Sequence, residues 1–178
     1  MTLRVQRGLP SLRDGRVVRE VRRSFAQAAE RGTFRVVQFS LQRDHVHLLI
    51  EANGRDALGR GMMSIGARIA RAVHRAFGMR GRVLEDRYHH RVLRTPREVR
   101  NALVYVLNNV RKHAPTSSRA RHPWVDPASS GGWFLGWTRR ITPAEGPPPV
   151  AAARSWLLRT GWTRHGRIDP AETPAGGP

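Results

Sequence analysis

Two histidines, His45 and His47, lie one residue apart in the apolar stretch 45–50. Alternate side chains of a β-strand share a face, so both imidazoles project from one face while Val46 and Leu48 point to the other. Two converging imidazole nitrogens form half of a site for a divalent metal ion. The simpler interpretation of this pattern is a hydrogen-bonded histidine pair in a half-buried strand.

A tyrosine and an asparagine further along the chain favour the metal interpretation. Tyr105 and Asn109 are four residues apart in a stretch of helical periodicity, so they share one face of a predicted helix. If that face turns toward the histidines, an oxygen ligand and a hydroxyl nucleophile lie beside the metal. Without the histidines, Tyr105 would be an ordinary aromatic residue of an amphipathic helix.

Hydrophobic periodicity predicts the elements that must position these groups. Alternating patterns indicate strands at 1–6, 34–41, 45–52 and 88–93, and helical spacing indicates helices at 16–31, 56–77 and 96–113. Thr95 and Glu98 form a predicted capping box at the start of the third helix, and Gly32 is the predicted cap at the end of the first. The order strand, helix, strand, strand, helix, strand is the split pattern of the ferredoxin-like α/β class.

Charge and composition restrict the partners. The 178 residues carry a net charge of +19, with 32 basic against 13 acidic residues, which indicates a polyanionic partner such as nucleic acid. Compositional drift toward Arg explains the choice of Arg over Lys but not this imbalance. The absence of cysteine excludes disulfides and thiolate zinc sites. No apolar run is long enough for a membrane span, so we expect a cytoplasmic protein without a membrane partner.

The domain prediction places residues 1–114 in the chemistry-bearing domain and residues 115–178 in a Trp-rich, partly irregular extension. The extension is expected to contain one short helix at 151–160 and a frayed end from 171 onward. Trp133 and Trp137 are expected to pack over the domain, with stacking on exposed bases as the alternative. Gly59, Gly61 and Gly66 are expected to weaken the helix at 56–77.

Three motifs in this order carry a resemblance to a known family. They are Asp44-His45-Val46-His47-Leu48-Leu49, then Glu85-Asp86-Arg87-Tyr88, then Tyr105-Val106-Leu107-Asn108-Asn109-Val110-Arg111. Over residues 1–114 the chain resembles the single-tyrosine HUH endonucleases, and more closely the REP-associated tyrosine transposases of bacteria. It departs from that pattern at Asp44, where the family has Asn, and at Val110, where the family has Pro.

The resemblance implies metal-dependent DNA cleavage and strand transfer. Tyr105 would be the nucleophile that forms a covalent 5′-phosphotyrosine, and His45, His47 and Asn109 would bind Mg²⁺ or Mn²⁺. The substrate would be single-stranded or hairpin DNA. The sequence leaves open whether two copies form a homodimer.

Further candidates for DNA contact are basic and aromatic residues of two segments. Arg87, Tyr88 and His90 belong to the first segment, where His89 and His90 point to opposite faces so that only one of them can reach the site. The second set, Arg68, Arg71 and Arg75, is a helical stripe that either tracks a DNA backbone or is a solvated face. Asp44 and Glu51 flank the histidine strand, and either is placed to orient an imidazole.

Two other functions remain open at this point. The chain could be a domesticated DNA-binding protein that keeps the fold but no longer cleaves. It could also be a phosphodiesterase that uses the histidine pair, although that class normally needs a second histidine motif, and none of the required spacing is found.

Overall fold

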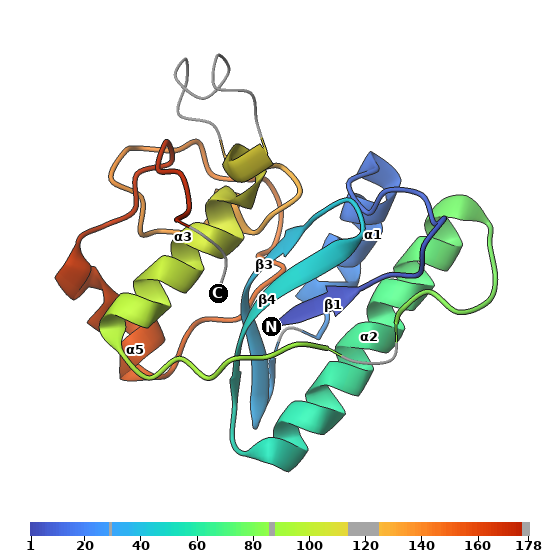
Figure 1. Cartoon of the computed structure of the whole chain (residues 1–178), viewed down its shortest axis with the longest axis horizontal. Helices are drawn as coiled ribbons and strands as arrows, with labels where there is room; N and C mark the ends of the chain where they lie inside the picture. Colours follow the sequence, from blue (N-terminus) through green and yellow to red (C-terminus); the bar gives the residue numbers. More distant parts are fainter. Residues whose placement is uncertain (29, 86–87, 114–124, 176–178) are drawn as a thin grey trace.

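A four-stranded antiparallel sheet forms the centre of this computed structural model, which describes residues 1–28, 30–85, 88–113 and 125–175. The strands β1 (Thr2–Arg4), β2 (Glu30–Arg31), β3 (Phe34–Leu41) and β4 (His45–Ala52) lie in the order β1-β4-β3-β2. Helices α1 (Gly15–Ala26) and α2 (Arg55–Phe77) cover one face, and α3 (Pro96–His113) lies on the other (Figure 1). The predicted α/β fold of the ferredoxin-like class is confirmed.

The β3–β4 hairpin decides which residues face α3. Backbone pairing sets Ser40 opposite His47 and Leu41 opposite Val46, and Gln42 N donates to His45 O at 2.8 Å to close the turn. Val46 and Leu48 point into the core beneath α1 and α2. The odd-numbered residues of β4 therefore face α3, as the alternation of a strand requires.

Two hydrophobic cores lie on the two faces of the sheet. The core under α1 and α2 includes fully buried Phe25, Phe39 and Ile69. At Gly61 of α2 the ring of Phe34 comes so close that a Cβ would lie 2.1 Å from it, so this glycine permits the helix to approach the sheet. The second core joins α3 to the C-terminal extension, and its buried residues are Leu49, Val99, Leu103, Val104, Val106, Leu107, Trp137, Trp162 and Ile168.

The predicted capping box fixes the start of α3. Glu98 N donates to Thr95 Oγ1 at 3.2 Å, and Thr95 N donates to the Glu98 carboxylate at 3.1 Å. Arg91 and the backbone N–H of Arg94 donate to the same carboxylate, which lowers the pKa of Glu98 to about 2. This helix begins where the sequence predicted.

The predicted strand at 88–93 is wrong as a continuous element. In this segment only His89 pairs with β1, through two backbone hydrogen bonds to Thr2 of 2.8 and 3.0 Å, and Leu84 forms a second single bridge to Val5. Beyond His89 the chain turns toward α3, where Arg91 binds Glu98. The fourth strand position of the ferredoxin-like order is therefore held by isolated bridges.

The first predicted helix was too long. The helix α1 ends at Ala26, and residues 30–31 turn back to pair with Phe34 and Arg35 as β2. Gly32, predicted as the helix cap, instead has a φ of +51° in the turn between β2 and β3. The hairpin pairing outcompetes helix propensity at these positions.

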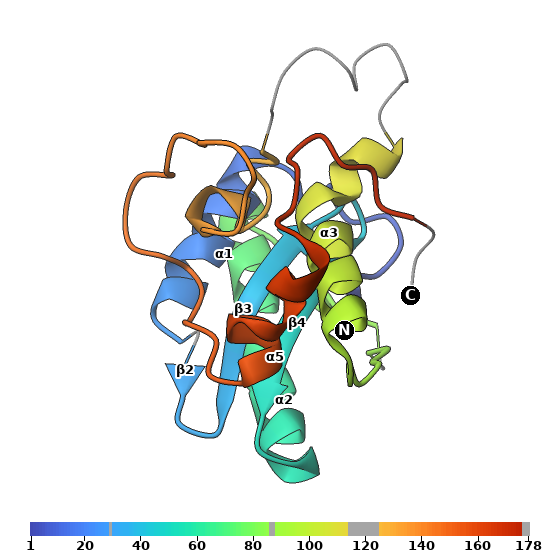
Figure 2. The same ribbon diagram turned by 90° about the vertical axis from the view of Figure 1, so that its left-hand side faces the viewer.

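The extension is anchored to α3 and to the sheet. Its short elements are η1 (Gly131–Trp133), α5 (Trp156–Arg159) and η2 (Gly161–His165), and in Figure 2 α5 lies beside α3 over the sheet. The indole N–H of buried Trp137 donates to Gly131 O at 3.0 Å, which confirms packing for this residue. The guanidinium of Arg22 lies over the ring of Trp133. The predicted domain boundary at 114 lies outside the described residues.

The frayed end predicted from 171 onward is wrong for residues 171–175. Arg100 of α3 holds both carboxylate oxygens of Glu172 at 2.8 Å, and Asn108 Nδ2 donates to the backbone oxygens of Asp169 and Glu172. Sequence composition gave no sign of these partners because they lie more than 60 residues away. The last residues, 176–178, lie outside the described part of the chain.

The extension also closes the edge of β3. Since β2 reaches only Phe34 and Arg35, residues further along β3 have free backbone groups on that side. Leu41 N donates to Ala128 O at 2.8 Å, Ser130 N donates to Phe39 O at 3.0 Å, and Ala151 N donates to Val36 O at 2.8 Å. These bonds satisfy a strand edge that would otherwise stay open.

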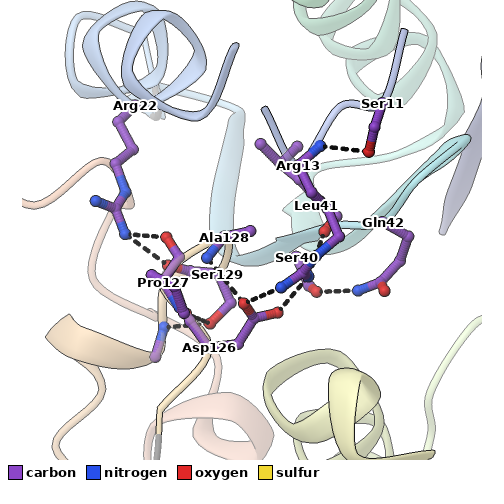
Figure 3. A network of polar contacts seen from close by, with 11 residues as sticks. Ser11, Arg13, Arg22, Ser40, Leu41, Gln42, Asp126, Pro127, Ala128 and Ser129 are labelled. Carbon is purple, nitrogen blue, oxygen red and sulfur yellow. Dashed lines mark hydrogen bonds and ion pairs between the residues drawn. The ribbon is translucent and has the colours of Figure 1, made fainter. Parts of the chain in front are cut away.

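A buried carboxylate holds this edge segment in place (Figure 3). The side chain of Asp126 is fully buried and accepts two hydrogen bonds of 2.8 Å from the guanidinium of Arg13 and a third from Ala128 N at 2.9 Å. Arg13 also donates to Leu41 O at 3.1 Å, so one guanidinium joins the extension to the end of β3. The hydrogen bond to Asp126 raises the pKa of Arg13.

Candidate active site

The two imidazoles of β4 lie against each other on the α3 face of the sheet. The Nε2 atoms of His45 and His47 are 3.0 Å apart, and their ring centroids are 4.5 Å apart. His47 is buried and His45 is half-buried. The convergence predicted from their spacing in the sequence is therefore present.

Each ring is held through its other nitrogen. The Asp44 carboxylate lies 2.7 Å from Nδ1 of His45, and the hydroxyl of Thr2 lies 3.0 Å from Nδ1 of His47. Thr2 reaches this position because β1 pairs with β4 and sets Thr2 directly opposite His47. The hydrogen bond from His45 lowers the pKa of Asp44. The Asp44 carboxylate can only accept from Nδ1, which favours the His45 tautomer whose lone pair is on Nε2, whereas the Thr2 hydroxyl can donate to His47 or accept from it.

The donor set fits a divalent cation. Two ligand atoms at right angles around an octahedral ion with bonds of about 2.1 Å would be about 3.0 Å apart, and the two Nε2 atoms have this spacing. Among the described residues, no group of three or more His, Cys, Asp or Glu side chains is placed to hold a metal. A third protein ligand would therefore come from another residue type. Asn109 is 1% exposed, and its Oδ1 is buried without a hydrogen-bond partner. A buried amide oxygen of this kind needs a donor or a cation.

The ring of Tyr105 lies against the ring of His47. Its ring centroid is 4.8 Å from that of His47, with the planes inclined by 69°. Tyr105 comes from α3 and His47 from β4, 58 positions earlier in the chain. The place of Asn109 in the site rests on its position one turn after Tyr105 and on its buried oxygen, which has no hydrogen-bond partner.

A cavity of about 1060 Å³ opens beside the phenol. Tyr105, His47, Tyr88 and His90 all line it, and the rings of Tyr88 and His90 are 6.0 Å apart. His89 does not line the cavity and is paired with Thr2 through its backbone. Of the two neighbouring histidines, His90 therefore adjoins the candidate site, as expected.

The arginines of α2 that were predicted to contact DNA do not lie beside Tyr105. Arg68 donates to Ser24 O at 3.2 Å and Arg75 binds Glu20 at 2.6 Å, so both pack against α1, on the opposite face of the sheet from Tyr105. Arg71 is exposed on the same helix. The structure does not bring this stripe to the site, and its role in DNA contact stays a prediction. Arg87 lies outside the described residues.

Sequence reasoning missed Thr2 and misjudged Glu51. Thr2 was part of a predicted strand, but its partner strand and register were unknown, and these decide which residue it meets. Glu51 does not orient an imidazole. It forms an ion pair of 3.3 Å with Arg35 and accepts hydrogen bonds from the backbone N–H groups of Arg154 and Ser155.

Comparison with known proteins gave one family match. Residues 10–108 match the family model described as Transposase IS200 like, a region that includes both histidines and Tyr105 and ends one residue before Asn109. No curated protein and no solved structure matches the chain. None of the described helices is both long and apolar enough to cross a membrane.

Proposed function

This chain belongs to the family of IS200-like transposases, DNA-cleaving enzymes, and from that membership we propose that it cleaves and transfers DNA strands with Tyr105 as the nucleophile. The substrate would be single-stranded or hairpin DNA, as in the narrower REP-associated group that the motifs resemble. The observation that supports this most strongly is the contact of the Tyr105 ring with His47 across 4.8 Å between ring centroids.

The covalent step follows from the chemistry of the phenol. The Tyr105 oxygen attacks the phosphorus of a phosphodiester, the bond to the 3′ oxygen breaks, and the phenolic proton is lost while the leaving oxygen gains one. The products are a 5′-phosphotyrosine and a free 3′-hydroxyl. Attack by that hydroxyl reverses the step, and attack by another hydroxyl transfers the strand. A free phenol has a pKa near 10, so activation depends on the groups around it.

The residues that would hold a divalent ion are His45, His47 and Asn109. Their support is the 3.0 Å separation of the two Nε2 atoms and the unpaired buried oxygen of Asn109. When bound, Mg²⁺ or Mn²⁺ polarises the scissile phosphate and offsets charge that develops on its oxygens. The chain's own contribution is to fix both rings through Asp44 and Thr2.

The test is an adduct assay with an end-labelled DNA hairpin and Mn²⁺. We expect a covalent protein–DNA species that disappears in Tyr105→Phe and on chelation of the metal. The chain has two tyrosines, so Tyr88→Phe is the matched control and should still give the adduct.

Other outcomes of this assay identify the other functions. Hairpin binding without an adduct in the unmodified protein would mean a DNA-binding module that no longer cleaves. Turnover of small nucleotides that persists in Tyr105→Phe would mean a phosphodiesterase.

A further inference from the structure

A second cavity, of about 440 Å³, lies between α1 and the segment of the extension that closes β3. Its lining combines three arginines with apolar residues, namely Arg13, Arg19, Arg22, Val18, Pro127 and Ala128. It shares no lining residue with the cavity beside Tyr105. The helix α1 covers the face of the sheet opposite α3 (Figure 1). The proposed cleavage chemistry therefore does not account for these three arginines.

Nearby carboxylates do not balance the positive charge of this cavity. Asp126 is occupied by two hydrogen bonds of 2.8 Å from Arg13 and one of 2.9 Å from the backbone N–H of Ala128. Asp14 forms its ion pair, of 3.1 Å, with Arg16. The described lining holds no acidic side chain. The cavity therefore keeps the charges of two of its three guanidinium groups.

Arg22 is a half-buried cation held by neutral groups. Its guanidinium donates to the backbone oxygens of Pro127 and Ser129 (Figure 3), and its Cζ lies 4.9 Å from the centroid of the Trp133 ring. Its Nε is buried without a hydrogen-bond partner. Burial lowers the pKa of Arg22, although Asp126 acts in the opposite direction. Among the described residues no carboxylate forms an ion pair with it, so this partly desolvated cation would gain from an anionic partner.

We propose that this cavity binds a small oxyanion of the phosphate class, such as phosphate or diphosphate, independently of DNA at Tyr105. Arg19 and Arg22 lie three residues apart in α1 and so share one face of the helix. Planar guanidinium groups match the paired oxygens of phosphate. The volume of about 440 Å³ is within the range of about 300–1,000 Å³ that is typical of small-molecule sites. No aromatic side chain is in the described lining, so the site suits the anion rather than a base.

An oxyanion in this cavity would hold the edge segment on β3 more firmly. Arg22 donates to Pro127 O and Arg13 donates to Leu41 O at 3.1 Å, so both guanidinium groups connect the cavity to the end of the strand. Like charges in one cavity repel, and an anion between them removes that repulsion while it fixes the side chains. Because the cavity exists only in the folded chain, binding shifts the equilibrium toward the folded state.

The experiment titrates the full chain with sodium diphosphate in an isothermal calorimeter, in metal-free chloride buffer of constant ionic strength. We expect one site per chain that is stronger than the diffuse attraction of diphosphate to the basic surface. Diphosphate at about 100 times its Kd should also raise the Tm by about 5–10 °C. Binding that is only diffuse, with no such site, would overturn the proposal.

Three variants of α1 locate the binding. Arg22→Gln removes the half-buried cation and should weaken diphosphate binding at least about tenfold, the effect of one hydrogen bond to a charged group. Arg19→Gln should do the same and carries the test if Arg22→Gln does not fold, because Arg19 is exposed. Arg23→Gln is the matched control, since Arg23 is exposed on the same helix and does not line the cavity. An equal loss of affinity in the Arg19 and Arg23 variants would refute the assignment.

A DNA hairpin distinguishes a free anion from a backbone phosphate. The diphosphate titration is repeated with the protein saturated with hairpin, and we expect an unchanged Kd. If the hairpin displaces diphosphate and Arg19→Gln weakens both ligands equally, the cavity takes DNA phosphates and the proposed independence is wrong. Tyr105→Phe should bind diphosphate as the unmodified protein does, so a failure of the adduct assay leaves this proposal in place.

Discussion

Gly59→Ala and Gly61→Ala in α2 should change the free energy of unfolding in opposite directions. Gly59 and Gly61 lie two residues apart in the same helix. An added Cβ at Gly59 would meet no atom within 4 Å, whereas at Gly61 it would lie 2.1, 2.3 and 2.4 Å from three atoms of the Phe34 ring. The two variants therefore make the same substitution in one helix, once where the new Cβ has open space and once where it meets the Phe34 ring.

The expected magnitudes follow from these distances. In a helix interior Ala is favoured over Gly by about 1 kcal/mol, so Gly59→Ala should stabilise by up to that amount. Gly61→Ala gains the same term, but carbon atoms in ordinary contact are about 3.5–4.0 Å apart, and the ring must move by more than 1 Å. Phe34 is 3% exposed, so its ring has no solvent space to enter. Overpacking of this kind costs about 1–3 kcal/mol, so after the helix gain is subtracted we expect a net destabilisation of up to about 2 kcal/mol.

Urea unfolding followed by circular dichroism measures both changes in the free energy of unfolding. A third protein, Gly61→Ala combined with Phe34→Leu, checks the cause, because a smaller side chain should relieve most of the clash. Equal stabilisation by both single substitutions would refute the argument, since it would mean that α2 does not pack on Phe34. A double variant with no coupling between the two sites would refute the assignment to this contact.

Three further predictions concern polar contacts. Thr2→Val keeps the shape of the side chain but removes the hydroxyl at His47, and we expect about 10–100-fold weaker Mn²⁺ binding by calorimetry, with recovery in Thr2→Ser. Asp126→Ala leaves Arg13 without its buried partner and should destabilise by about 3 kcal/mol in urea unfolding, near the lower end for a broken buried pair because the arginine is 28% exposed. Burial raises the pKa of Glu51, but its hydrogen bonds outweigh burial and hold it below 4.5. Its contribution to stability is therefore complete above pH 4.5 and is lost as pH falls through the lower folded pKa, so Glu51→Gln should flatten the acid limb of thermal stability below pH 4.5.

Local patterns in the sequence were sufficient for the elements that carry the chemistry. The β4 strand was predicted at its observed bounds because two histidines alternate with Val46 and Leu48 and further apolar residues follow. The start of helix α3 was predicted correctly because Thr95, Pro96 and Glu98 form a complete start signal. The contact between Tyr105 and His47 was expected from the family resemblance, which implies that the two residues share one site.

Features that depend on distant partners were not predictable in this way. The register between β1 and β4, which brings Thr2 to His47, is set by the packing of the whole sheet. Glu51 looked like a neighbour of the histidines, but its partners come from a segment more than 100 residues later. The pairing with Thr2 is likewise confined to His89 within the segment 88–93, and beyond it Arg91 binds Glu98.

Because the C-terminal extension pairs with the edge of β3, shortening the chain from its C-terminal end should lower its solubility. A polypeptide that stops after α3 would lose the partners of Val36, Phe39 and Leu41 and would bare the apolar side of α3 that Trp137 and Trp162 now cover. Such a product would expose an unpaired strand edge and an apolar helix face to other molecules, and we expect it to aggregate. Shortened versions should therefore keep the segment that carries Trp137 and Trp162.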